Sequence, residues 1–246
     1  MRILPILFAI AVCTSNLAFS QDQKDEPSVK EPSGQKADEA EAKADKTMTK
    51  EEPGVAKAIS GAAKIDGKID DAWKKAPMLK VVKPVDGIVQ IEEKDMATAT
   101  VQVMYDQGTL YALWQVTDDK LSDGGADPWE HDSVELFLDQ DNKKSSVYDD
   151  NDGQYRVNFK GLMSGQGTGY NKDFCKAATA KTENGYIVEM ALKITHVKLK
   201  SGVKMGFDLQ VNDDAGDGSR SAVAKWYNDE DDSWENASTF GTLILK

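Results

Sequence analysis

The sequence predicts an all-β fold, an antiparallel β-sandwich of the jelly-roll type with one short helix near its N-terminal end. From about residue 56 onward, short runs alternate apolar and polar residues, which is the two-residue period of strands with one buried face. Clusters of Gly, Asn and Asp separate these runs at regular intervals, as turns do in sandwiches. No longer repeat is visible, which argues against a propeller or a solenoid.

The first residues, 1–20, are typical of an export signal. Arg2 precedes the apolar run Ile3–Val12, and Ala18-Phe19-Ser20 places small residues where a signal peptidase reads them. We therefore predict cleavage before Gln21 and a secreted protein, extracellular or periplasmic. The apolar run is shorter than the roughly 20 residues of a membrane span. Val12 is too bulky for the residue that precedes a lipid-attachment cysteine, which argues against lipidation at Cys13.

Residues 21–55 are rich in Glu, Asp, Lys, Ala, Ser and Pro and poor in large apolar side chains, so we expect a disordered acidic linker. The remaining residues, 56–246, form the predicted sandwich domain. The 246 residues carry a formal net charge of -12, which disfavours nucleic acid and membrane surfaces as partners but suits neutral glycans and divalent cations. After cleavage only Cys175 remains, so neither an intrachain disulfide nor a zinc site is expected.

The predicted elements follow in order. A short helix is expected around Asp70–Lys75, with an aspartate at its start. The alternation then predicts strands at Thr100–Tyr105, Leu110–Thr117, Ser133–Asp139, Gln154–Phe159, Lys176–Thr182, Tyr186–Leu192, Met205–Asn212, Ser221–Trp226 and Gly241–Leu245.

One face of this sheet is predicted to carry long planar polar groups. In the three strands at Ser133–Asp139, Gln154–Phe159 and Met205–Asn212, the apolar residues share one side and the polar residues point the other way. Carboxylate, guanidinium and amide groups can each engage adjacent sugar hydroxyls. The alternative interpretation is an ordinary solvated sheet face. The side chains concerned are Glu135, Arg156, Asn158, Gln210 and Asn212.

Of the five tryptophans, two stand apart from the rest. Trp73 and Trp114 lie in patterns typical of core residues, and Trp226 at a strand end is ambiguous. Trp129 and Trp234 lie in the polar loops ADPWEHDS and DEDDSWENAS, where a large ring loses hydration free energy unless something covers it. Indole rings stack on the apolar faces of pyranose rings. Both could instead fold back as loop plugs.

Several ordered segments resemble carbohydrate-binding module family 9. They include IDGKIDDAWKKAP, DPWEHDSVELFLDQDN, DDNDGQYRVNF, GFDLQVNDD and DDSWENASTFGTLIL, and the similarity covers nearly everything from about residue 56 onward. The resemblance implies a β-sandwich that binds the reducing end of cellulose, xylan and small sugars between two tryptophans, here Trp129 and Trp234. It also implies Glu135, Arg156 and Asn158 as polar contacts. Family members can carry Asn where this chain has Asp231, which we include among the expected sugar contacts.

Acidic clusters predict oxygen ligands for calcium. Neither glycine-containing cluster fits a helix-loop-helix calcium loop, but structural calcium is known in the resembled family. The alternative is a set of solvated acidic loops. The ligands we would expect are Asp118, Asp139, Asp150, Asp152 and Asp213.

These features favour a non-catalytic binding module whose partner is a mono- or disaccharide or a polysaccharide chain end, with a separate glycoside hydrolase as a further candidate partner. A second hypothesis is an enzyme or accessory subunit in polysaccharide hydrolysis. Glu135 beside Arg156 would be held ionised, which suits hydroxyl recognition rather than acid catalysis. A third hypothesis is a sandwich domain that binds a cofactor or a protein.

Overall fold

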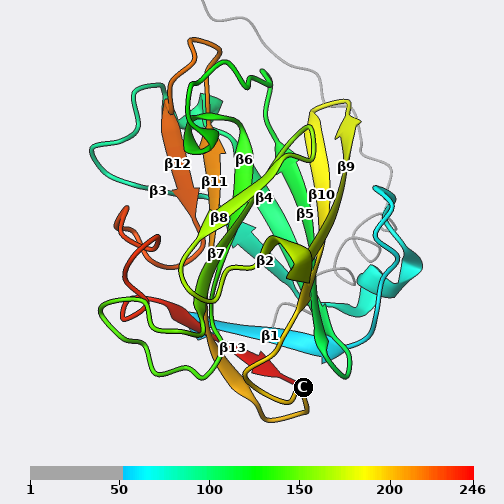
Figure 1. Cartoon of the computed structure of the whole chain (residues 1–246). Coiled ribbons are helices and arrows are strands. Elements are labelled where there is room, and N and C mark those ends of the chain that lie inside the picture. The colour runs from blue at the N-terminus through cyan, green and yellow to red at the C-terminus, as the bar shows by residue number, and fades with distance from the viewer. Residues whose placement is uncertain (1–51) are drawn as a thin grey trace, which may run out of the picture. The chain divides into compact units, whose positions relative to one another are not determined.

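The computed structural model describes residues 52–246; the expected signal peptide and all but the end of the expected linker lie outside the described residues. The all-β prediction is confirmed (Figure 1), since the helices of the described part are 3-10 turns of three to five residues. The strands are β1 (Val55–Ser60), β2 (Met78–Val81), β3 (Lys83–Pro84), β4 (Thr98–Tyr105), β5 (Thr109–Thr117), β6 (Ser133–Asp139), β7 (Asp152–Asn158), β8 (Met163–Gln166), β9 (Cys175–Thr182), β10 (Gly185–Lys193), β11 (Lys204–Asp213), β12 (Ala222–Lys225) and β13 (Gly241–Leu245). The 3-10 turns are η1 (Asp71–Lys75), η2 (Glu93–Asp95), η3 (Pro128–Glu130) and η4 (Lys172–Phe174).

The strands follow one path, β8-β7-β6-β11-β13-β1-β4-β5-β10-β9, that divides into two sheets at β1. Residues Val55–Ala58 of β1 pair with β13, and Ile59–Ser60 pair with β4. In the first sheet β12 also pairs with β11 and with β3, and in the second β2 pairs with β4. In Figure 1 the strands β12, β11 and β6 lie to the left, and β5, β10 and β9 to the right.

Three features differ from the sequence prediction. The sheets are not purely antiparallel, because β1 runs parallel to both β13 and β4. Where a short helix is predicted at Asp70–Lys75, the structure forms the five-residue 3-10 turn η1. Its flanks, Asp70 and Ala76, are both in extended conformation, which limits the helix to this one turn. Four strands were not predicted: β1, β2, β3 and β8.

The main core lies between the two sheets. It gathers inward residues from both, such as Trp114 and Val188 of the second sheet and Leu136 and Phe207 of the first. Trp73, on η1, packs in a smaller cluster against the outer side of the second sheet with Met104 and Leu113. The predictions that Trp73 and Trp114 are core residues are therefore confirmed.

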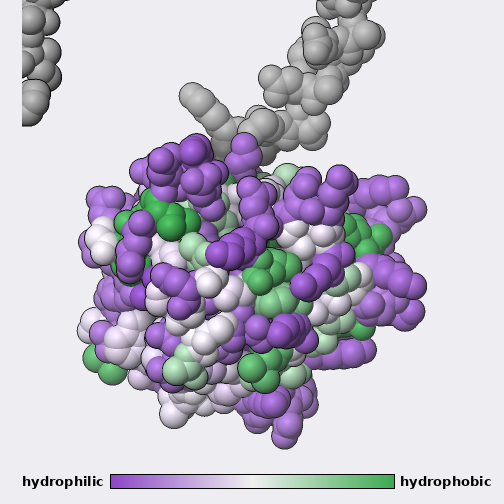
Figure 2. All heavy atoms as spheres, turned by 90° about the horizontal axis from the view of Figure 1, so that it is seen from above, coloured by the Kyte–Doolittle hydropathy of each residue, from purple (hydrophilic) through white to green (hydrophobic). Residues whose placement is uncertain are grey.

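The outer face of the first sheet is covered rather than solvated. Every residue of β6 and β7 is buried, including those that alternation turns away from the core. The segments that cover this face include the loops that carry Trp129 and Trp234. Each of these two residues is itself 45% exposed. Figure 2 shows mostly hydrophilic residues on one face of the molecule, with hydrophobic residues in small separate patches. None of the described helices is long and apolar enough to cross a membrane.

Candidate functional site

The polar side chains of the covered face lie in rows that cross the first sheet. Strand register places Gln210 opposite Glu135, and Glu135 opposite Arg156. The row continues to Lys225 on β12 and to Ser164 on β8. Paired residues point to the same face, so five neighbouring strands contribute polar groups to one line. The alternative of a wet sheet face does not hold, because Glu135 is 1% exposed and Gln210 3%.

Glu135 is the centre of this row. Its Oε1 accepts hydrogen bonds from Arg156 Nε at 2.6 Å and from Asn212 Nδ2 at 2.6 Å, and its Oε2 accepts one from Gln154 Nε2. Burial alone would raise the pKa of Glu135, but the Arg156 guanidinium and the two amides outweigh it, so the pKa lies below its usual range. Glu135 is therefore an ionised, acceptor-only group.

Trp129 is carried by the short turn η3, which precedes β6. Pro128 starts this turn, and the Glu130 side chain closes it by accepting a hydrogen bond from the Asp127 N–H at 2.9 Å. His131 follows, with Nε2 3.0 Å from the Gly125 carbonyl oxygen. These local bonds fix the backbone on both sides of an otherwise half-exposed indole.

Trp234 lies in the β12–β13 connection, and hydrogen bonds within this loop and from β8 fix its position. Its Nε1–H donates to the Asp231 carbonyl oxygen at 3.0 Å, and its own carbonyl oxygen accepts from Gln166 Nε2 at 2.8 Å. The Asp231 carboxylate forms a forked ion pair with Arg220, with Nη2 2.5 Å from Oδ2. Both the ring and the carboxylate of this loop are thus oriented without any ligand.

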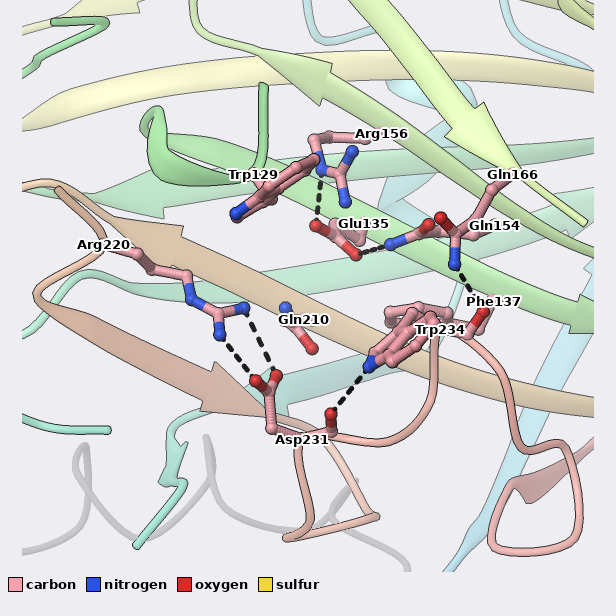
Figure 3. Close-up of a pocket in the computed structure, with 10 residues that line it drawn as sticks. All are labelled: Trp129, Glu135, Phe137, Gln154, Arg156, Gln166, Gln210, Arg220, Asp231 and Trp234. Atoms are coloured by element: carbon pink, nitrogen blue, oxygen red, sulfur yellow. Dashed lines mark hydrogen bonds and ion pairs between the residues drawn. The ribbon is translucent and has the colours of Figure 1, made fainter. Parts of the chain in front are cut away.

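The rows and the two loops enclose a cavity of about 290 Å³ (Figure 3). In this view Trp129 and Trp234 lie on opposite sides of Glu135 and Gln210. The lining combines aromatic rings with forked polar groups, which is the combination that sugar rings and their hydroxyls require. The lining residues are Trp129, Glu135, Phe137, Gln154, Arg156, Gln166, Gln210, Arg220, Asp231 and Trp234.

A buried charge cluster lies beside the cavity floor. Lys225 and Asp208 are both fully buried, with the ammonium 3.0 Å from Asp208 Oδ2. The ammonium also donates to Ser233 Oγ at 2.6 Å and lies 4.6 Å from the centre of the Phe137 ring. Because Ser233 directly precedes Trp234 and Phe137 lines the cavity, this cluster ties the second tryptophan's loop to the sheet.

The structure brings six of the eight predicted sugar contacts to the cavity: Trp129, Glu135, Arg156, Gln210, Asp231 and Trp234. Asn158 does not line it. Its Oδ1 instead accepts from the N–H groups of Lys160 and Leu162 and closes the β7–β8 turn. Asn212 is fully buried beside Glu135, so its contact is with the floor rather than with the cavity.

Sequence reasoning did not select Phe137, Gln154, Gln166 and Arg220. The alternation already put Phe137 on the Glu135 face and Gln154 on the Arg156 face, so that signal was available. Gln166 lies on the unpredicted strand β8. Arg220 lies in a loop, and only its ion pair with Asp231 reveals its position.

Asp118 and Asp213, both predicted as metal ligands, form a candidate cation site together with Asp132. Asp118, Asp132 and Asp213 each place a carboxylate oxygen within 4.8 Å of the others, and all three are buried. Burial raises the pKa of Asp118 to about 6 and that of Asp132 to about 8, and it also raises the pKa of Asp213. Asp118 Oδ2 has no partner among the described residues. Crowded carboxylates with an unsatisfied oxygen fit a hard cation such as Ca²⁺.

The other predicted metal ligands lie elsewhere. Asp139 and Asp152 face each other across β6 and β7, and Asp152 Oδ1 is buried without a partner in the described part of the chain. Asp150 is exposed on the neighbouring loop. The predicted metal ligands therefore lie at two separate sites, and the site of Asp118 and Asp213 also includes Asp132, which is not among the predicted ligands.

Comparison with known proteins agrees with the family resemblance of the sequence. A family model described as "Carbohydrate family 9 binding domain-like" matches residues 65–246. The chain is 44% identical over 191 residues to "Exoglucanase XynX" of Acetivibrio thermocellus and 41% identical over 191 residues to "Endo-1,4-beta-xylanase A" of Thermoanaerobacterium saccharolyticum. Each match covers 78% of this chain but only 17% and 16% of those proteins, so the chain spans less than a fifth of their length.

Among solved structures, the chain is similar to a carbohydrate binding module family 9 from Caldicellulosiruptor kristjanssonii. It matches the complex with cellotriose at a TM-score of 0.71 and 28% identity, covering 78% of this chain and 93% of that one. It matches the complex with glucose at a TM-score of 0.71 and 28% identity, covering 78% and 95%.

Proposed function

We propose, since this chain belongs to carbohydrate-binding module family 9, that its cavity binds the end of a neutral polysaccharide chain with one pyranose ring between Trp129 and Trp234. Carbohydrate binding is the function of the domain, and the clamp, the sugar class and the end that is bound are our proposal. The observation that carries it is that two half-exposed indoles and a buried polar floor line the same cavity. The ring faces would contact the indoles, and the hydroxyl rim would reach the floor.

The charges of the cavity favour binding over catalysis. Its two carboxylates, Glu135 and Asp231, are each paired with an arginine, at 2.6 Å and 2.5 Å. Glycoside hydrolysis needs one carboxyl group that stays protonated to act as an acid, and a paired, ionised carboxylate is unsuited to that role. We therefore propose a non-catalytic module.

The paired charges also indicate the class of sugar. Two carboxylates and two guanidiniums leave the cavity lining neutral, so a neutral sugar meets no net charge there. The similar modules were solved with cellotriose and glucose, and the curated relatives carry names of xylan- and glucan-degrading enzymes. We propose β-glucan or xylan ends as the ligands, and a separate glycoside hydrolase as a further partner.

The clamp is tested by titrating glucose, cellobiose and xylobiose into the wild-type domain and into Trp129→Ala and Trp234→Ala. Losing one stacking surface should weaken binding by about 2 kcal/mol or more, roughly thirtyfold. Tyr227→Ala is a matched control, because Tyr227 is 37% exposed and does not line the cavity. Unchanged affinity in both tryptophan variants would refute the clamp.

We further propose Ca²⁺ as the ion held by Asp118, Asp132 and Asp213, where its two positive charges would offset most of the negative charge of three buried carboxylates. These side chains belong to chain segments far apart in the sequence, so the ion would stabilise the fold rather than act on a sugar.

Export of the protein through a cleaved signal peptide is a further proposal. Mass spectrometry of the mature N-terminus would test cleavage before Gln21, and a protein that starts at Met1 would contradict it.

A further inference from the structure

The acceptor oxygens of Glu135 are largely engaged within the protein. The carboxylate is 1% exposed and takes hydrogen bonds from Arg156, Asn212 and Gln154. A carboxylate offers about four acceptor positions, so little capacity is left for a ligand. Glu135 is therefore better placed to orient its neighbours than to bind a sugar hydroxyl.

This arrangement fixes the orientation of the Gln154 amide. Side-chain amides have a donor end and an acceptor end, and an ionised carboxylate accepts only. The Nε2 of Gln154 must then face Glu135, and its Oε1 must point away. That oxygen is buried and has no hydrogen-bond partner among the described residues, although Gln154 is only 2% exposed and lines the cavity. Buried acceptors without a donor are rare and costly.

The neighbouring floor groups are mainly donors. Arg156 uses Nε for Glu135 and Nη1 for Ser164, at 3.2 Å, which leaves further N–H groups of its five to donate. Gln210 has its Oε1 engaged by Lys225 and its Nε2 by Asn212. Gln154 Oε1 thus offers the floor an acceptor that no described residue uses.

We propose that Gln154 Oε1 accepts a hydrogen bond from one hydroxyl of the bound sugar, which makes Gln154 a specificity-determining residue and Glu135 a positioning residue. The proposal rests on the proposed sugar-binding function and adds to it the direction of one hydrogen bond. The hydroxyl read by Gln154 must donate, whereas one read by Arg156 must accept. The site therefore distinguishes hydroxyl groups by their direction as well as by their position.

Modified sugars test this direction. Wild-type protein is titrated with glucose and with its monodeoxy and deoxyfluoro analogues at each ring position. A fluorine cannot donate a hydrogen bond, so at the hydroxyl read by Gln154 both replacements should lower affinity equally, by about tenfold. At a hydroxyl that accepts from Arg156, the fluorine should retain part of the affinity. If no position shows equal losses, the proposal is overturned, and this test needs no protein variant.

The variant Gln154→Met then tests whether Gln154 is the residue that causes this loss of affinity. It should bind glucose and the critical monodeoxy sugar with the same affinity, within about twofold, while discrimination at the other positions persists. Gln166→Met is the control, since this amide also lines the cavity but donates to the Trp234 carbonyl oxygen. It should keep the discrimination at the critical position.

A uniform loss for all sugars in Gln154→Met, with discrimination unchanged, would show a structural role only and overturn the proposal. If wild-type protein binds no neutral sugar at all, the proposed function itself fails. The two failures are therefore distinguishable.

Discussion

Replacing Lys225 by methionine tests whether the buried charge cluster holds the fold beside the cavity. The substitution keeps the length of the side chain but leaves Asp208 buried without its cation. Breaking a buried ion pair in this way costs about 3–5 kcal/mol. For a domain of roughly 200 residues each kcal/mol corresponds to about 2–4 °C, so we expect the melting temperature to fall by roughly 10 °C.

The assay is thermal unfolding followed by circular dichroism, with sugar titration of the folded protein in parallel. Affinity should also fall, because Ser233, the residue before Trp234, loses the shorter of the two hydrogen bonds that its Oγ accepts. The double variant Asp208→Asn/Lys225→Met removes both charges and should recover most of the melting temperature.

Lys83→Met is the control for this prediction. Lys83 pairs with Asp229 at 3.0 Å, but the two side chains are 46% and 64% exposed. Pairs exposed to this degree contribute less than about 1 kcal/mol. If Lys225→Met melts within 2 °C of wild type, as the control should, the inference that the buried pair stabilises this loop is wrong.

Three further predictions follow from the site. Glu135 has a lowered pKa, so its contribution to stability is complete above the unfolded pKa and is lost as the pH falls through the folded pKa. Sugar affinity measured by calorimetry should therefore stay flat from about pH 8 to pH 5, and a fall in affinity within this range would contradict an ionised Glu135. Calcium at about 100 times its dissociation constant should raise the melting temperature by roughly 5–10 °C. Asp118→Asn, whose amide nitrogen can take the place of the unpartnered Oδ2, should abolish that rise relative to the same variant in chelator, and an equal rise in the variant would place the ion elsewhere. If the cavity binds reducing ends, cellobiose should bind at least about tenfold more tightly than its alditol, and equal affinities would contradict this.

The face of the sheet could be predicted from sequence because strand alternation is local. Ser133–Asp139 was assigned with the bounds that β6 has, and its polar residues turn away from the core as expected. The same alternation could not separate Gln154 from Asn158, since both point to one side of β7. Asn158 ends the strand, where its side-chain oxygen Oδ1 accepts hydrogen bonds from the backbone N–H groups of Lys160 and Leu162 in the following turn. Which residues of a face line a cavity depends on the loops above it, and alternation carries no information about those.

Residues that come together only through tertiary contacts could not be predicted, because no local sequence pattern marks them. Arg220 meets Asp231 only because the loops after β11 and β12 lie side by side. Asp132 joins Asp118 and Asp213 because the ends of three chain segments converge. Short strands were missed for a related reason. The sequence of β8, MSGQ, has no apolar alternation, and its pairing with β7 gives it extended conformation.

A sheet face that is polar, buried and internally paired is costly for a protein to maintain, because desolvated charges recover little net stability from one another. The cost is understandable if the face is preorganised for a ligand. Glu135, Arg156 and Gln154 already make the hydrogen bonds that orient them, so binding a sugar would order few additional side chains. The remaining contribution would come from Trp129 and Trp234, which are 45% exposed and have apolar surface left to bury. Affinity should then depend mainly on the two rings and selectivity on the floor, so variants of the two regions should change different properties of binding.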